Sequence, residues 1–185
     1  DSKLFFNKKV LSTKKTTFIL LNGKNLITLK AQIKINFQKY KQIDLKKFFA
    51  DEETIKIPII GLCKKVIIKT KVKIYPKKNY SLDGLYESNE MICSQCEPQG
   101  FRKISWFPDR PDNLSIFKVR IEASKKYKFI LSNGDLIRQC KIKGTDKKYV
   151  IWKDPFPKPS YLFALVAGNL EVTSGEFVTK SKKRV

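Results

Sequence analysis

Phe117-Lys118-Val119-Arg120-Ile121-Glu122 is the stretch that decides the fold class. Apolar and charged side chains alternate strictly along it, and a period of two places each kind on its own face of a β-strand. The β-branched and aromatic residues support the same interpretation, because they pack well on a pleated surface. This stretch therefore predicts a strand with one face in a core and the other in water.

Two further segments, Val66 to Tyr75 and Leu26 to Ile35, show the same alternation. Both are rich in β-branched residues and both are predicted to be strands. The residues expected to face inward are Ile68, Thr70, Val72 and Ile74 in the first segment and Leu29, Ala31, Ile33 and Ile35 in the second.

Turn-forming residues separate these segments. Asn22-Gly23 and Asn133-Gly134 each combine two residues that tolerate positive φ, and both are predicted to be hairpin tips. Pro58 lies inside the apolar stretch Ile55 to Ile60 and should confine that strand to a sheet edge or a bulge. The proline-rich run from Asp154 to Pro159 cannot be helical, so we expect a stiff, extended connection.

Many short strands separated by turns predict an all-β fold, an antiparallel β-sandwich, with residues 1–185 forming one domain. Tyr161 to Ala167 is a continuous apolar run, which favours a strand buried on both faces. Asp109 to Asp112 is expected to cap one short helix. Lys180 to Val185 has the polar composition of a tail or of a linker to a following domain.

Composition agrees with a folded domain, since 42% of the residues are hydrophobic and 12% are aromatic. No apolar run approaches the roughly 18 residues that a membrane span needs. The first residues lack the layout of a signal peptide, and the chain does not begin with Met. We therefore expect a segment that belongs to a longer protein.

The formal net charge of +22 raises the hypothesis of nucleic-acid binding. Only five of the 39 basic residues are Arg, which is the best reader of phosphates and guanines, and the lysines are scattered from Lys3 to Lys183. Abundant Lys, Ile, Asn, Phe and Tyr would also follow from an AT-rich genome. The sequence thus favours a solvated coat of lysines over a nucleic-acid interface.

Four cysteines raise the question of a metal or redox site. Cys93 and Cys96 have the spacing of half a zinc site or of a redox pair. A structural zinc site would need a second close pair of ligands, whereas Cys63 and Cys140 are isolated in the sequence. A redox pair normally opens a helix, and none is expected here. We therefore predict free thiols in a reducing cytoplasm and no metal site in this chain.

The chain contains no histidine, which excludes Ser-His and Cys-His nucleophile pairs. No glycine-rich phosphate loop occurs either. Glu87, Glu90 and Glu97 lie close together in sequence, but surface glutamates are far commoner than acid–base pairs. Tyr86 to Arg110 carries most of the polar variety outside lysine, and polar loops on a rigid sheet often hold binding groups. A carboxylate there would favour a cationic ligand such as a protonated amine.

Three motifs in the second half of the chain carry a resemblance to a known family. They are QCEPQGFR (Gln95 to Arg102), DRPD (Asp109 to Asp112) and DPFPKPSYLFALVAG (Asp154 to Gly168). In order and spacing they resemble the amino-terminal domain of bacterial aminopeptidase N, a zinc metalloaminopeptidase of the gluzincin class. Leu82 to Tyr86 and Leu131 to Gly134 fit the same pattern. Before Leu82 the resemblance is weak, and we expect the family's first strands to be partly missing.

The resemblance implies a saddle-like β-sandwich that covers a catalytic domain and closes one side of its active-site cavity. It also implies that Glu97 helps to bind the free α-ammonium of a peptide substrate and that Gln95 lines the pocket for the first side chain. A carboxylate suits this task because a charge-assisted hydrogen bond fixes the amine at one distance from the scissile bond. Asp109, Arg110 and Asp112 are expected to form a buried ion pair or cap.

The zinc-binding motifs of this family, a His-Glu-x-x-His helix and a later glutamate, are absent from the sequence. We expect them in a catalytic domain that follows Val185, so the resemblance implies zinc in the parent enzyme and an inactive segment here. The predicted function is substrate recognition in a cytoplasmic enzyme that releases amino-terminal residues from peptides. Its expected partners are its own catalytic domain and peptide substrates. The alternatives are a non-enzymatic β-sandwich interaction module and, less favoured, a nucleic-acid-binding domain.

Overall fold

The computed structural model describes residues 1–7, 16–60 and 63–182. Antiparallel strands make up most of it, in agreement with the predicted fold class. The strands are β1 (Ser2–Asn7), β2 (Thr16–Asn22), β3 (Ile27–Ile35), β4 (Lys41–Gln42), β5 (Thr54–Ile60), β6 (Lys65–Lys73), β7 (Gly84–Ser88), β8 (Met91–Gln95), β9 (Ser115–Ser124), β10 (Phe129–Ser132), β11 (Asp135–Lys141), β12 (Lys147–Lys158) and β13 (Leu165–Gly168).

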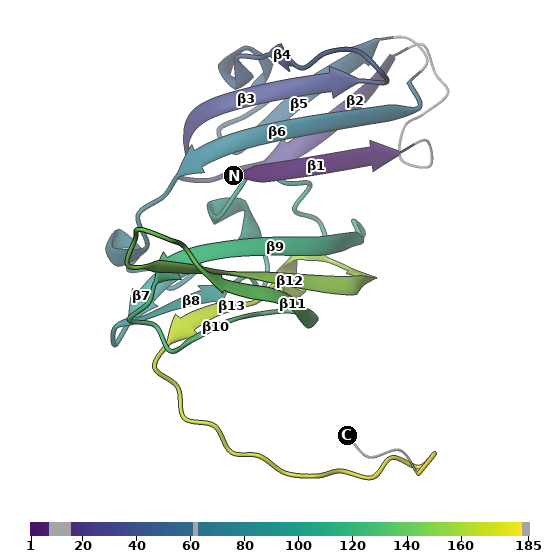
Figure 1. Cartoon of the computed structure of the whole chain (residues 1–185). Coiled ribbons are helices and arrows are strands. Elements are labelled where there is room, and N and C mark those ends of the chain that lie inside the picture. The colour runs from purple at the N-terminus through teal and green to yellow at the C-terminus, as the bar shows by residue number, and fades with distance from the viewer. Residues whose placement is uncertain (8–15, 61–62, 183–185) are drawn as a thin grey trace.

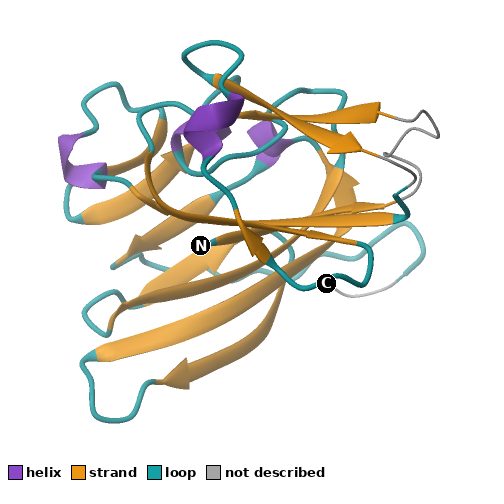
Figure 2. Ribbon diagram, turned by 90° about the horizontal axis from the view of Figure 1, so that it is seen from above, coloured by secondary structure: helices purple, strands orange, loops and turns teal. Residues whose placement is uncertain are grey.

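The helical elements in the described residues are short 3₁₀ turns, and Figure 2 shows them in the connections between strands. They are η1 (Leu45–Phe48), η2 (Pro76–Lys78), η3 (Phe101–Lys103) and η4 (Ser160–Leu162). A search of the described residues finds no helix with the length and apolar character of a membrane span.

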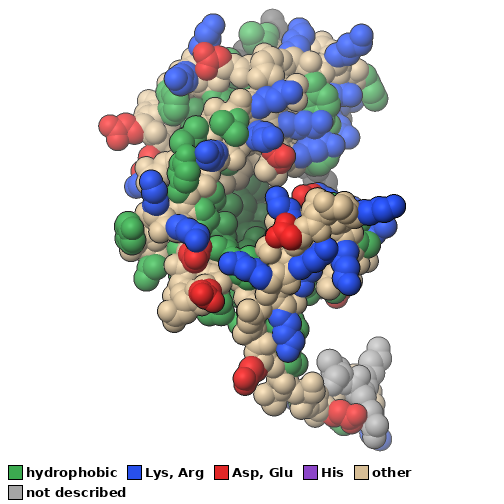
Figure 3. Space-filling model, turned by 60° about the vertical axis from the view of Figure 1, so that its left-hand side comes forward, with side chains coloured by type: hydrophobic (Ala, Val, Ile, Leu, Met, Phe, Trp, Pro, Cys, Tyr) green, Lys and Arg blue, Asp and Glu red, His purple; other side chains and the backbone are tan. Residues whose placement is uncertain are grey.

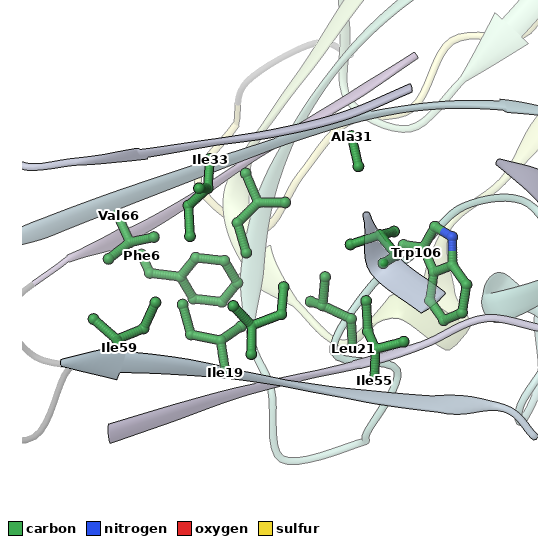
Figure 4. Close-up of a cluster of buried hydrophobic side chains, with 12 residues drawn as sticks. Phe6, Ile19, Leu21, Ala31, Ile33, Ile55, Ile59, Val66 and Trp106 are labelled. Atoms are coloured by element: carbon green, nitrogen blue, oxygen red, sulfur yellow. The ribbon is translucent and has the colours of Figure 1, made fainter. Parts of the chain in front are cut away.

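The first half of the chain forms a sandwich of two sheets, with strand orders β1-β6-β3-β4 and β2-β5 (Figure 1). Figure 4 shows Phe6, Ile19, Leu21 and Ile33 pointing into the space between these sheets. The predicted inward side of β6 is confirmed, since Ile68 and Thr70 are buried. In β3 the prediction is right for Ala31 and Ile33 but wrong for Leu29, which is 55% exposed where a bulge shifts the register.

The second half forms another sandwich from the sheets β10-β13-β8-β7 and β11-β12-β9 (Figure 1). Ile130, Val150 and Ala167 form its core. A separate cluster of Cys96, Phe101, Phe107 and Phe163 also packs against Leu4 of β1. Trp106 belongs to the core of the first sandwich, so the adjacent residues Trp106 and Phe107 join the two halves.

Neither predicted Asn-Gly hairpin forms. β2 pairs with β5 and β3 with β6, so Asn22-Gly23 connects strands in different sheets. Asn133-Gly134 likewise connects β10, which pairs with β13, to β11, which pairs with β12. Gly134 does use a positive φ of 82°. Gly23 does not adopt a positive φ. At both sites, burial of apolar faces in opposite layers overrides local pairing.

Three other expectations have mixed outcomes. Pro58 lies in β5 of the two-stranded sheet, which agrees with the predicted edge position. Asp154 to Pro159 is extended as predicted, because β12 continues to Lys158. Tyr161 to Ala167 is not one buried strand: it begins in the 3₁₀ turn η4, Leu162 and Ala164 are exposed, and only its end belongs to β13.

The carboxyl-terminal part of the described chain leaves the sheets after Gly168 and runs away from them (Figure 1). Its residues are mostly exposed. Residues 183–185 of the predicted tail or linker lie outside the described residues, so the linker role stays a prediction.

Candidate substrate-binding site

Gln95 and Glu97 lie together at the end of one strand. Gln95 is the last residue of β8 and pairs with Gly84 of the edge strand β7, and Glu97 opens the turn that follows. Both side chains are exposed, and neither makes a hydrogen bond or ion pair with another described residue. The carboxylate and the amide are therefore available to a ligand.

Cys96, between these two residues, fixes the turn to the core. Its side chain is 2% exposed and packs with Phe101, Phe107 and Phe163. Burial raises the pKa of the Cys96 thiol to about 12, and the charges of Asp109 and Asp83 add to this effect. Cys96 points into the core, and its two neighbours, Gln95 and Glu97, are exposed on the other side of the chain.

Gly100 closes the same turn by donating its N–H to the carbonyl oxygen of Cys96 at 3.1 Å. A Cβ at this position would clash with the carbonyl oxygen of Gln95 and with Asp83 Oδ1, so the tight approach requires glycine. The peptide bond between Pro98 and Gln99 in this turn is cis.

A buried ion pair lies directly behind the turn. Arg102 donates its backbone N–H and its Nε to Asp109 Oδ2, both at 3.1 Å. Ser160 donates its hydroxyl to the other oxygen of Asp109 at 2.5 Å. Arg102 also reaches Glu53 Oε2 at 3.2 Å, and Lys24 lies 2.5 Å from Glu53 Oε1. The hydrogen bond from Lys24, followed by that from Arg102, holds the pKa of Glu53 below its usual value.

The prediction for Asp109, Arg110 and Asp112 is therefore right for one residue and wrong for the other two. Asp109 is buried and ion-paired, but its partner is Arg102. Arg110 and Asp112 pair with each other at 2.8 Å in an exposed position. The segment forms no helix, so the predicted cap is wrong. Asp109 is buried because its carboxylate accepts hydrogen bonds from Arg102 and Ser160, and neither residue belongs to the segment Asp109 to Asp112.

Sequence reasoning missed the roles of Arg102, Glu53 and Ser160 in this network. Glu53 precedes β5 and Ser160 begins η4, so both come from parts of the chain far from Arg102. The available signal was Arg102 itself, since it follows the apolar residue Phe101, and a guanidinium that becomes buried needs an acidic partner.

Gln95 and Glu97 lie outside the lining of the cavity beside β7. The cavity beside β7, of about 380 Å³, is lined by residues that include Tyr75, Asn79, Ser81 and Lys103. Lys103 is held there by Asp83 at 2.9 Å. Glu97 and Gln95 are instead exposed at the surface.

The donor set of the residues that the structure describes does not fit zinc. The described residues contain no group of three or more His, Cys, Asp or Glu side chains that could hold a metal ion. All four cysteines are free thiols. Cys96, the second cysteine of the Cys93-x-x-Cys96 pair, has a raised pKa, whereas a zinc ligand must be a thiolate.

Three curated aminopeptidase N proteins are similar to this chain. The protein from Caulobacter vibrioides is 50% identical over 119 residues, covering 64% of this chain and 14% of the relative. The Haemophilus influenzae protein is 42% identical over 165 residues, with 84% and 17% covered. The Escherichia coli protein is 44% identical over 135 residues, with 72% and 15% covered. The chain thus spans about a sixth of the length of these relatives.

Two solved structures share the fold. Legionella pneumophila aminopeptidase A in complex with aspartic acid superposes with a TM-score of 0.83 at 32% identity, covering 99% of this chain and 21% of that chain. An M1 zinc metallopeptidase from Deinococcus radiodurans, a mutant bound to a Tyr-Ser-Ala substrate, gives a TM-score of 0.68 at 19% identity, with 91% and 38% covered.

The family model of the peptidase M1 N-terminal domain matches residues 3–162. The match begins far before Leu82, so the family pattern extends well beyond the motifs in the second half of the chain. This all-β chain belongs to the peptidase M1 N-terminal domain family.

Proposed function

We propose that this chain is the substrate-recognition and cavity-closing domain of a zinc aminopeptidase that releases amino-terminal residues from peptides. Family membership supports the enzyme class. The observation that carries the recognition role is the state of Glu97: an exposed carboxylate with no described partner, on a turn that Cys96 and Gly100 hold in place.

A carboxylate in this state is suited to bind a substrate ammonium. It has no cationic partner among the described residues that binding would have to displace, although the chain carries a net charge of +22. The fixed turn limits the conformational entropy that binding would cost. When a catalytic domain covers the turn and excludes water, the attraction between carboxylate and ammonium becomes stronger.

We assign Gln95 to the pocket for the first side chain of the substrate. It lies two residues before Glu97 at the end of the same strand, so both can face one peptide terminus. Its amide can donate and accept hydrogen bonds without adding charge. Glu97 would therefore set the position of the amine, and Gln95 would influence which side chain follows it.

The zinc of the reaction belongs, in this proposal, to a catalytic domain outside the segment. When bound there, zinc would supply an activated water for peptide hydrolysis. We also propose a cytoplasmic location, which the four free thiols support.

The test replaces Glu97 in the full-length enzyme. Glu97→Gln keeps the shape of the side chain and removes its charge, and we expect kcat/KM for peptides with a free amino terminus to fall about ten- to a hundredfold. Glu90→Gln is the matched control, because Glu90 is exposed in the turn at the opposite end of β8. Equal kcat/KM for Glu97→Gln and the wild type would refute the assigned role.

A further inference from the structure

Lysines that are scattered in sequence gather on one face of the first sheet. Ile68 and Thr70 of β6 point into the core, so the residues that alternate with them point outward. Directly paired residues on neighbouring antiparallel strands share a face, and the register extends this outer side to β1 and β3. The outward lysines, here called the basic face, are Lys3, Lys30, Lys34, Lys65, Lys69, Lys71 and Lys73.

Figure 3 shows Lys and Arg side chains crowded over the upper right of the molecule, on the side to which this sheet turns its outer surface. The scatter of the lysines along the sequence therefore does not carry over to the folded chain. The reason is geometric: strands from three parts of the chain pair in one sheet, and each contributes lysines to the same side.

The positive charge of the basic face is not balanced within the described chain. Strands β1, β3, β4 and β6 contain no Asp or Glu, and Asp1 is the one acidic residue that adjoins them in sequence. None of the seven lysines forms a salt bridge with a described residue. Two pairs even lie directly opposite each other, Lys3 with Lys69 and Lys30 with Lys71. Such like-charged pairs destabilise a sheet unless an anion neutralises them.

Two aromatic rings organise four of the ammonium groups. Lys3 and Lys65 lie 4.7 and 5.6 Å from the centroid of the Phe5 ring. Lys69 and Lys34 lie 4.0 and 5.6 Å from the centroid of Tyr40. Cation–π attraction of this kind holds the positive charges in place. It also covers the rings, so they are poorly placed to stack with the bases of a single-stranded nucleic acid.

An exposed aromatic residue adjoins this face. Phe37 lies in the turn between β3 and β4 and is 100% exposed. The turn is tied to the start of β6, because Asn36 Oδ1 accepts hydrogen bonds from the backbone N–H groups of Lys64 and Lys65 at 2.8 and 3.2 Å. A fully exposed aromatic ring beside a cluster of lysines is the combination that a lipid interface accommodates.

We propose that the basic face and Phe37 form a peripheral docking surface for an anionic phospholipid bilayer. The open face of a sheet fits a planar target, and lysines act as point charges that need no defined phosphate geometry. Phe37 enters the interfacial region while the lysines remain at the headgroups. This proposal concerns a different surface from the turn of Glu97 and does not depend on the proposed function.

The test measures co-sedimentation of the protein with vesicles. At low salt we expect the protein to bind vesicles made of equal parts phosphatidylcholine and phosphatidylglycerol, and to bind vesicles of phosphatidylcholine alone only weakly. Added salt should release the bound protein, because it screens the attraction between the lysines and the anionic lipid. Lys30→Glu combined with Lys71→Glu should weaken the binding by at least about tenfold, since each lysine near an anionic surface contributes about 1 kcal/mol. Phe37→Ser should weaken binding to the same vesicles without changing its salt dependence.

Lys118→Glu combined with Lys153→Glu is the matched control, because these exposed lysines are also directly opposite each other, on β9 and β12. This control should retain most of the binding. Equal losses in the two double variants would show a general effect of net charge and overturn the proposal. So would absence of binding to the anionic vesicles at low salt, including the case in which the basic face binds single-stranded RNA instead.

Discussion

Arg102 and Asp109 form a buried ion pair, with Arg102 Nε 3.1 Å from Asp109 Oδ2 and side chains that are 10% and 3% exposed. The pair spans the segment that begins at η3 and carries Trp106 into one core and Phe107 into the other. Arg102 is the last residue of the motif that contains Glu97, so this ion pair also fixes one end of the motif to the core. Its hydrogen bonds replace the water that both charges lose on burial.

Asp109→Ala should lower the free energy of unfolding by about 3–5 kcal/mol, because it leaves the Arg102 guanidinium buried without its main partner. The Ser160 hydroxyl would lose its acceptor as well. Urea denaturation monitored by tryptophan fluorescence would measure the change, since Trp106 lies in the adjoining core.

Asp112→Ala is the control for this prediction. It removes the same kind of side chain from an ion pair, with Arg110, that is 60% and 65% exposed. Exposed pairs contribute at most about 1 kcal/mol, so the control should be close to the wild type. Similar losses in the two variants would contradict the interpretation that burial makes the Arg102 pair important.

Gly100→Ala should destabilise the protein by about 1–3 kcal/mol, as over-packing does in a tight core. The added Cβ would clash with the carbonyl oxygen of Gln95 and with Asp83, so the turn that carries Glu97 must shift. Gly175→Ala is the control, because nothing lies within 4 Å of a Cβ at that position. Thermal unfolding of both variants would decide the point, and an unchanged midpoint for Gly100→Ala would refute the tight fit.

The strands of the fold could be predicted from the sequence because their signal is local. The alternation in Val66 to Tyr75 identified both the strand and its buried side, and Pro58 marked an edge. Which strand pairs with which could not be predicted in the same way. Asn22-Gly23 has the residues of a hairpin turn, yet its flanking strands lie in opposite sheets, since packing of Leu21 against the other layer decides the connection.

The candidate site shows the same division. Glu97 and Gln95 could be selected because they belong to a recognisable motif, and their exposure agrees with a binding role that remains a prediction. The residues that hold the motif in place could not be paired from sequence. Arg102 donates hydrogen bonds to Asp109, at the other end of a loop, and to Glu53, which lies 49 residues earlier in the chain. Only the folded chain brings these three groups together.

Cys140 should react with iodoacetamide much faster than Cys96 near neutral pH. A hydrogen bond from Arg138, with Sγ 3.3 Å from Nε, and a second one from Tyr149 lower the pKa of Cys140. Burial has the opposite effect on Cys96 and raises its pKa to about 12. Mass spectrometry of the alkylated peptides would give both rates, and Arg138→Ala should slow the reaction of Cys140. Faster labelling of Cys96 in the folded protein would show that its burial is wrong.

Cys96 should also make the stability of the protein depend on pH in the alkaline range. An unfolded Cys96 ionises around its ordinary pKa of 9.0, whereas the folded thiol stays protonated until about 12. Between these values the unfolded state binds fewer protons, so the contribution of Cys96 is present below pH 9 and is lost as pH rises toward 12. The difference in free energy of unfolding between the wild type and Cys96→Ala, measured by urea denaturation, should therefore shrink by up to about 1.4 kcal/mol per pH unit. Cys140→Ala is the control: its thiol has a lowered pKa, so its difference from the wild type should not shrink over this range. A constant difference for Cys96→Ala would contradict the raised pKa.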